Sequence, residues 1–214
     1  MSASSPLKGC RDCPRLAGFL DEVRAQKPAY FAAPVPPFGD AAPRLLIVGL
    51  APGMHGANRT GRPFTGDYAG ILLYQTLFDF GFSTGPESVS ADDPLRLKDC
   101  RITNAVKCLP PENKPEPSEI RSCNRYLREE MAALSSVRVV LALGLVAHKA
   151  VLMAEGLKAS AFAFGHNARH ELPGGRVLID SYHCSRYNTQ TRRLTPESFA
   201  DVFKAIRAEL EYAC

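Results

Sequence analysis

The chain has 214 residues, of which 45% are hydrophobic and 22% charged, and it carries a net charge of +4. These values are typical of a soluble globular protein, and the length suits a single domain spanning residues 1–214. No apolar run approaches the roughly 20 residues that span a bilayer, and the N-terminus lacks the apolar core of a signal peptide, so we expect a cytoplasmic protein.

Hydrophobic periodicity predicts helices that alternate with short apolar strands. In chain order we expect a helix at residues 14–26, an extended connection at 30–43, a strand at 44–50, a helix at 69–82, a strand at 101–106, a helix at 118–134, a strand at 137–144, a helix at 145–157, a strand at 176–181 and a helix at 196–212. Thr195 is the expected N-cap of the last helix, whereas Ser118 and Arg121 offer only a partial capping pattern. The alternation predicts a parallel sheet with helices on both faces.

The carboxyl ends of parallel strands meet at one edge of a sheet, where α/β proteins bind ligands. The loops that follow Leu50, Val106 and Ser181 are therefore expected to lie side by side. This placement brings a glycine-rich loop, Cys108 and the segment HCSRYN to the same edge.

Four of the seven cysteines form two distant pairs, Cys10 with Cys13 and Cys108 with Cys123. If the pairs converge, four thiolates suit an iron–sulfur cluster or zinc. The second pair is separated by fourteen residues, which fits a zinc ribbon poorly. A disulfide framework is not expected in a reducing compartment. Cys100 and Cys214 are expected to be ordinary thiols.

A glycine-rich loop, GLAPGMHGANRTGRPFTGD at residues 49–67, follows the first strand. It lacks both the phosphate-loop and the dinucleotide-binding patterns. Phe64 lies among hydrogen-bonding side chains, which suits a pocket that stacks on a flat ring and reads its edge. A long ordered loop without a ligand is the alternative. Residues 183–195 hold three arginines and no acidic residue, which suits a phosphate backbone or a solvated surface.

Four motifs together resemble the uracil-DNA glycosylase superfamily and its type-5 branch (UDGb), which carries an iron–sulfur cluster. They are CRDCP at residues 10–14, the glycine-rich loop at 49–67, ITNAVKCLPPENKP at 102–115 and SYHCSRYNTQTRRLT at 181–195. The resemblance implies a three-layer α/β fold with a central four-stranded parallel sheet flanked by helices. It also implies a [4Fe–4S] cluster on Cys10, Cys13, Cys108 and Cys123. The implied activity is removal of uracil, and of other deaminated bases, from DNA.

The resemblance further implies a base-binding pocket formed by Gly49, Ala51, Pro52, His55, Phe64 and Asn104. Phe64 would stack on a base flipped out of the duplex, and the Asn104 amide would bind O4 and N3–H of uracil. The alternatives are a core Phe that anchors the loop and an amide that caps a strand end. Asn113 is expected to hold the loop of the cysteine site.

Two residues are expected to carry the chemistry. His183 would donate a hydrogen bond to uracil O2 as the base leaves as an anion. Many members of the superfamily place Asp or Asn where this chain has Ala51, so Asp67 is the nearest candidate to orient water or stabilise the sugar cation. Alternatively, Asp67 is the N-cap of the helix that follows.

For DNA binding we expect Ser185, Arg186, Tyr187 and Asn188, with Tyr187 as a wedge that fills the vacated base stack. Cys184 stands where the type-5 motif usually has Pro, and it adds conformational freedom and an oxidisable thiol. We expect a monomer that releases the base without cutting the strand, because no Lys is placed as a Schiff-base nucleophile. A non-catalytic binder of damaged DNA that retains the cluster and a redox protein are the alternatives.

Overall fold

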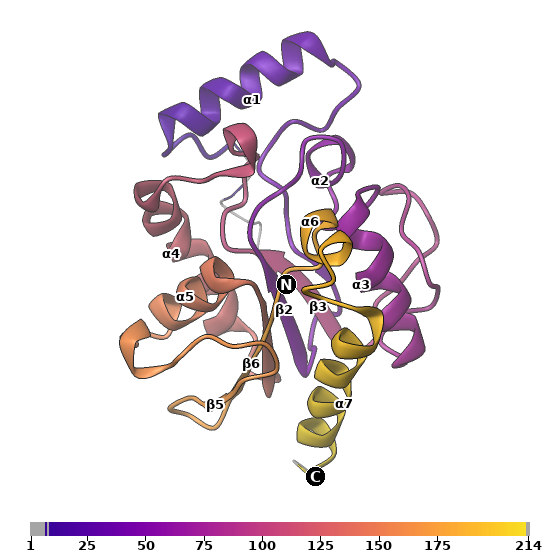
Figure 1. Cartoon of the computed structure of the whole chain (residues 1–214). Coiled ribbons are helices and arrows are strands. Elements are labelled where there is room, and N and C mark those ends of the chain that lie inside the picture. The colour runs from indigo at the N-terminus through magenta and orange to yellow at the C-terminus, as the bar shows by residue number, and fades with distance from the viewer. Residues whose placement is uncertain (1–6, 8, 213–214) are drawn as a thin grey trace.

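A six-stranded sheet forms the centre of the computed structural model, which describes Leu7 and residues 9–212 (Figure 1). The strands are β1 (Phe38–Gly39), β2 (Leu45–Gly49), β3 (Cys100–Asn104), β4 (Val139–Leu143), β5 (Arg169–Glu171) and β6 (Val177–Ser181), in the spatial order β1-β3-β2-β4-β6-β5. The inner four strands are parallel, and β1 and β5 pair antiparallel at the two edges. The expected four-stranded parallel sheet is confirmed, with two edge strands added. Cys214 lies outside the described residues.

The inner strands form where the sequence has continuous apolar runs. Every residue of β2, β4 and β6 is buried, as parallel strands covered on both faces require. The two edge strands were missed because they carry no such run. Strand β1 has two residues, and β5 has three, of which only the middle one is half-buried.

Helices cover both faces of this sheet (Figure 1). The helices of the described residues are α1 (Pro14–Gln26), α2 (Ala57–Thr60), α3 (Tyr68–Asp79), α4 (Pro117–Ala133), α5 (Leu145–Ala154), α6 (Arg186–Gln190) and α7 (Pro196–Tyr212), with 3-10 turns at Pro111–Asn113 and Ala159–Ala161, and α3, α4, α5 and α7 form the two covering layers. Leu77 of α3 and Phe203 of α7 pack with Ile47 on one face. Leu127 of α4 and Val151 of α5 pack with Leu46 on the other. The three-layer arrangement is therefore confirmed.

Helix α1 lies beyond the carboxyl edge of the sheet, apart from these two layers (Figure 1). Its residue Leu16 packs with Val106 and Cys123, and Leu20 packs with Leu109. The helix thus brings the N-terminal C-x-x-C toward the loop after β3. Of the helices among the described residues, none combines the length and apolar composition needed to cross a membrane.

Several boundaries differ from the sequence-based expectation for local reasons. Helix α3 ends at Asp79 and does not continue to residue 82, because Gly81 adopts a positive φ of 72°. Helix α4 is capped by Glu116 and Glu119 and not by Ser118 with Arg121. These two carboxylates form a reciprocal capping box, which the sequence pattern for Ser or Thr does not detect.

We predict that Ile47→Ala destabilises the protein by about 2–5 kcal/mol. Ile47 is fully buried at the centre of β2, so the shorter side chain leaves a cavity among residues of α3 and α7. Ile71→Ala is the matched control, because Ile71 on α3 is 65% exposed and should change stability by less than about 0.5 kcal/mol. Urea unfolding midpoints measure both effects. Equal midpoints for the two variants would contradict the packing described above.

Candidate functional site

A cavity of about 380 Å³ opens at the carboxyl edge of the sheet. Its lining is Leu50, Ala51, Gly53, Ala57, Phe64, Asp67 and Ala69 after β2, Asn104 and Asn113 at and after the end of β3, and His183 and Ser185 after β6. The three loops expected at one edge therefore do meet. The volume lies in the range of pockets that bind small organic ligands.

The positions of Phe64 and Asn104 in the cavity lining depend on the absence of a side chain at Gly49. A Cβ atom at Gly49 would lie 2.5 Å from Asn104 Oδ1 and 2.6 Å from Phe64 Cζ, both closer than real Cβ contacts. Gly49, at the end of β2, thus lets the Phe64 ring and the Asn104 amide reach the same place. Gly49 and Pro52 are not among the residues that line the cavity.

Phe64 has an unusual backbone conformation for its residue type, with a φ of 55°. Neighbouring contacts hold it there, since the Tyr74 hydroxyl donates to the Pro63 carbonyl at 2.8 Å. The ring is 6% exposed and stacks with the His183 ring at 5.9 Å between centroids and 29° between planes. Phe64 therefore contributes to the core, as one expectation held, and also presents an aromatic surface to the cavity.

Asn104 ends β3 with a buried amide oxygen that has no hydrogen-bond partner among the described residues. The residue is 3% exposed. An unpaired buried acceptor costs free energy in the free protein. The amide therefore does not act as a strand cap, and its oxygen is available to a donor that enters the cavity.

Asp67 caps a helix and also lines the cavity. Its Oδ1 accepts a hydrogen bond from the Gly70 amide at 2.9 Å, so it is the N-cap of α3. Its Oδ2 faces the backbone of Gly53 and Gly56 across the cavity lining. Burial raises the pKa of the carboxyl, opposed by the backbone hydrogen bonds of Gly70 and Ala69. A carboxylate with a raised pKa is suited to accepting a proton.

His183 reaches the cavity from the loop after β6. Burial lowers its pKa to about 4, so the imidazole is neutral at pH 7 and can donate from one nitrogen. The Asn188 amide nitrogen donates to the His183 carbonyl at 2.8 Å, and Ser185 caps α6 through the Asn188 backbone. Asn188 therefore fixes the backbone of this loop, a role that the sequence did not suggest.

Two residues lie elsewhere than the sequence suggested. His55 is exposed, pairs with the Tyr30 hydroxyl at 2.8 Å, and is not among the residues that line the cavity. Asn113, expected at the cysteine site, lines the cavity instead. It has a φ of 58° within the 3-10 turn Pro111–Asn113. Its position just after two prolines in a loop beyond a strand end is the only sequence signal for this placement.

The short helix α6 forms the outer rim beside the cavity. Tyr187 is 71% exposed, and the Arg186 guanidinium lies 5.6 Å from the centroid of the Tyr68 ring. Cys184, in contrast, is fully buried in the core, and burial raises the pKa of its thiol. The thiol next to His183 is therefore protonated and shielded from solvent, and it fills space in the core.

The four cysteines expected to form a site do converge. Cys10, Cys13, Cys108 and Cys123 line one small cavity together with Leu7, Leu16 and Tyr126. The Lys107 amide donates to Cys123 Sγ at 3.3 Å. Burial raises the pKa of Cys13 to about 11 and of Cys108 to about 12, so four thiolates here would need a bound positive group.

The spacing of these sulfurs indicates the size of a fitting group. Within the described residues, no three of them lie within 4.8 Å of one another. A single tetrahedral zinc ion holds its sulfur ligands about 3.8 Å apart, since Zn–S bonds are about 2.3 Å. The three-sulfur groupings among the described residues are thus wider than the spacing around one zinc ion.

Ion pairs hold the N-terminal arm, which is the segment from Cys10 to the end of α1 at Gln26, against α4, independently of the sulfurs. Arg15 on α1 binds the Glu119 carboxylate at 2.7 Å. Arg125 on α4 pairs with Asp12, which lies between the two N-terminal cysteines. Both contacts link the C-x-x-C to the helix that carries Cys123.

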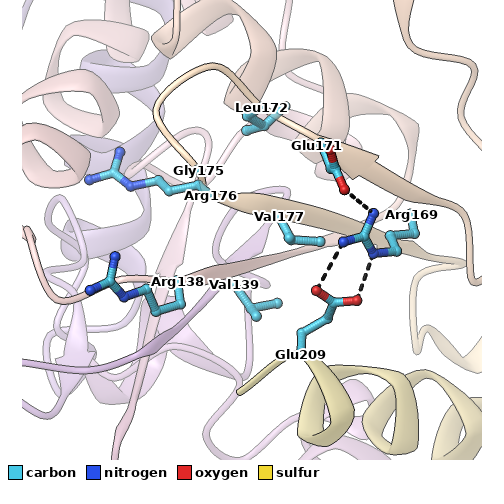
Figure 2. A pocket seen from close by; sticks show the side chains of 9 residues that line it. All are labelled: Arg138, Val139, Arg169, Glu171, Leu172, Gly175, Arg176, Val177 and Glu209. Atoms are coloured by element: carbon cyan, nitrogen blue, oxygen red, sulfur yellow. Dashed lines mark hydrogen bonds and ion pairs between the residues drawn. The ribbon is translucent and has the colours of Figure 1, made fainter. Parts of the chain in front are cut away.

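A larger hollow of about 510 Å³ lies at the opposite edge, near the first residues of β4 and β6 (Figure 2). Its Arg169 side chain is bound by Glu209 at 2.6 Å and by Glu171 at 3.0 Å (Figure 2). Arg176 pairs with Glu155 at 2.8 Å. Among the described residues, the buried polar atoms without a hydrogen-bond partner include Asn104 Oδ1 at the carboxyl-edge cavity and none from the lining of this hollow.

The fold and site define an α/β protein with a cavity, lined by an aromatic ring and polar side chains, at the carboxyl edge of its sheet. A model of the uracil DNA glycosylase superfamily matches residues 36–207. A type-5 uracil-DNA glycosylase of Thermus thermophilus is 52% identical over 201 residues, which cover 92% of this chain and 91% of that protein. One from Pyrobaculum aerophilum is 44% identical over 207 residues, covering 95% and 90%. The chain therefore belongs to the uracil-DNA glycosylase superfamily.

The resemblance drawn from the four motifs is thus confirmed. A type-4 uracil-DNA glycosylase of Pyrobaculum aerophilum is 34% identical over 154 residues, which cover 72% of this chain and 64% of that protein. The chain is similar to the two type-5 proteins over nine-tenths of its length, a wider span than its match to this type-4 protein.

The low pKa of His183 predicts a specific pH dependence of stability. The unfolded imidazole takes up a proton near pH 6.5, whereas the folded one does so only near pH 4. The unfolded state therefore binds more protons between pH 4 and 6.5, so stability should rise with increasing pH, and be lost as the pH is lowered through this window, by up to about 1.4 kcal/mol per pH unit. The slope should flatten in His183→Gln and persist in His55→Gln, measured by urea unfolding from pH 4 to 7. An unchanged slope in His183→Gln would refute the assignment.

Proposed function

We propose that this chain is a monofunctional glycosylase that flips uracil, and other deaminated bases, out of DNA and hydrolyses the N-glycosidic bond. The whole chain, residues 1–214, acts as one domain and as a monomer in the cytoplasm. The unpaired Asn104 oxygen beside the Phe64 ring carries the proposal. The oxygen can accept a hydrogen bond from an N–H group, and the ring can stack on a planar ligand that bears this group on its edge. Uracil offers N3–H next to O4, which matches the two ends of an amide.

Base binding in this proposal uses the groups that meet at Gly49. A base within a duplex is unreachable, so it must rotate out of the stack into the cavity. Phe64 then contacts the face of the ring, and Asn104 reads its edge. Asn113 lines the same cavity and adds a second amide near the base.

The reaction separates charge between the sugar and the base. Uracil leaves with the bonding electrons as an anion, and water supplies hydroxyl to the sugar carbon. Neutral His183 donates a hydrogen bond to uracil O2 as negative charge grows there. The Asp67 carboxylate orients the water or stabilises the sugar cation, in place of the polar group that Ala51 cannot supply.

The product is an abasic site in an uncut strand. No lysine is among the residues that line the cavity. Lys107 is 1% exposed and its ammonium pairs with Glu130 at 3.1 Å, so it is not available as an amine nucleophile. Water is therefore the attacking group.

DNA contacts outside the cavity come from the rim around α6. Exposed Tyr187 is suited to fill the gap left by the flipped base, and Arg186 is suited to bind phosphate. Ser185 and Asn188 contribute chiefly by shaping the loop, since both make hydrogen bonds within it.

The cofactor in this proposal is a [4Fe–4S] cluster bound by Cys10, Cys13, Cys108 and Cys123. The support is an all-sulfur donor set in which, among the described residues, no three sulfurs lie within 4.8 Å of one another. When bound, the cluster supplies structural bracing and takes no part in base release. It connects the N-terminal arm, the loop after β3 and α4, and this loop also carries Asn113 into the cavity.

The first test uses a duplex with one U·G mismatch, scored for base release by alkali cleavage under single-turnover conditions. We predict release by the wild type and at least about a 100-fold lower rate in Asp67→Asn. Asn caps helices as well as Asp does, so this variant should keep its stability, whereas Asp67→Ala should lose about 1 kcal/mol as well. Full activity of Asp67→Asn would remove the carboxylate from the chemistry. Intact but tightly bound DNA with wild-type protein would favour the non-catalytic binder.

For the cofactor, we predict that Cys108→Ser purified without oxygen loses most of its iron, acid-labile sulfide and visible absorbance. Cys100→Ser is the matched control, because Cys100 is a fully buried thiol in the core layer of α3 and α7. It should keep wild-type iron content. One zinc and no sulfide in the wild type would refute the cluster while leaving the glycosylase proposal standing.

A further inference from the structure

Three side chains outside the cavity form a compact cluster with metal-ligand chemistry. His148 on α5, His170 on β5 and Asp180 on β6 place one ligand atom each within 4.8 Å of the others. The side chains of His148 and Asp180 are 1% and 0% exposed, and that of His170 is 13% exposed. Neither the base chemistry nor the cysteine site uses them.

Both ring nitrogens of His148 face oxygen atoms. Its Nε2 lies 3.0 Å from the Phe162 carbonyl oxygen, an obligate acceptor, so Nε2 carries a proton. Its Nδ1 lies 2.8 Å from Asp180 Oδ1, which is also an acceptor. A neutral ring would turn a lone pair toward the carboxylate. Either a second proton or a metal ion must therefore lie between Nδ1 and Oδ1.

The second histidine favours a metal ion in this place. His170 Nε2 lies 3.2 Å from the other oxygen, Asp180 Oδ2. Zinc with nitrogen and oxygen ligands at about 2.0–2.1 Å holds neighbouring ligand atoms about 3.3 Å apart. The contact of His170 already has this length, and that of His148 would have to widen by about 0.5 Å.

We propose that His148 Nδ1, His170 Nε2 and the Asp180 carboxylate bind one divalent ion of the zinc class. The other nitrogen of His148, Nε2, hydrogen-bonds to the Phe162 carbonyl. In metal sites such a hydrogen bond orients the ring of a histidine ligand. The rings of Phe162 and Phe164 pack against the two histidines and give the site an apolar wall. Water completes the coordination from the side of partly exposed His170.

Such an ion would be structural. It would join α5 and the edge strand β5 to β6, the strand that leads directly to His183. The inference does not rest on the proposed glycosylase activity, because its ligands do not line the cavity.

The test uses Co²⁺ and Zn²⁺ with the purified, cluster-loaded chain after mild chelation. We expect one Co²⁺ per chain and, in the difference spectrum against the cobalt-free cluster-loaded chain, ligand-field bands without new sulfur-to-metal charge transfer, which separates this site from the cysteines. Zinc at about 100 times its Kd should raise Tm by about 5–10 °C. Both effects should be lost in His170→Gln and kept in His166→Gln, whose ring bonds to Tyr182 and Ser198 outside the cluster.

The wild-type cobalt spectrum decides the matter even if His170→Gln fails to fold. A spectrum with only thiolate charge transfer, or equal Co²⁺ binding by wild type and a folded His170→Gln, would overturn the proposal. Either result would mean that a proton bridges His148 and Asp180. Absent base release in the separate uracil assay would not affect this outcome.

Discussion

The missing side chain of Gly49 is the constraint on which the cavity depends. Parallel pairing sets Gly49 of β2 beside Asn104 of β3, and only a residue without Cβ lets the Phe64 ring enter that corner. This arrangement requires a left-handed backbone conformation at Phe64, which is unfavourable for a bulky residue and is held in place by buried contacts around Tyr74. The cavity is therefore built by backbone geometry before any ligand arrives.

Burial sets the chemistry of both sites in the same direction, toward neutral groups. It keeps His183 uncharged at neutral pH, favours the protonated form of Asp67, and raises the pKa of the thiols of Cys13 and Cys108. In the proposed reaction, a neutral imidazole would donate a hydrogen bond to the leaving base without carrying a full positive charge. At the cysteines the same desolvation makes a bound positive group the natural partner of four thiolates.

The sequence was sufficient to predict the four inner strands and which of their ends meet at one edge of the sheet. Apolar runs marked the four inner strands, and strand order placed Asn104 and His183 at one edge before any coordinates. The sequence did not predict elements whose formation depends on a few local contacts. The three residues of β5 carry no apolar pattern, and the capping box of α4 uses Glu116 where Ser or Thr is the usual signal. Asn113 was not expected at the cavity that it lines, and it has a positive φ that the sequence pattern did not indicate.

The N-terminal arm is fastened in two ways that respond differently to solution conditions. Arg125 and Asp12 are both about half exposed, so dissolved ions weaken their attraction, while Glu119, at 5% exposure, is better shielded. Sulfur bonds to a bound group do not weaken with ionic strength. With the proposed group bound, attachment of the N-terminal arm would depend more on coordination and less on charge as the salt concentration rises. Loss of that group would then loosen α1 least at low salt and most at high salt.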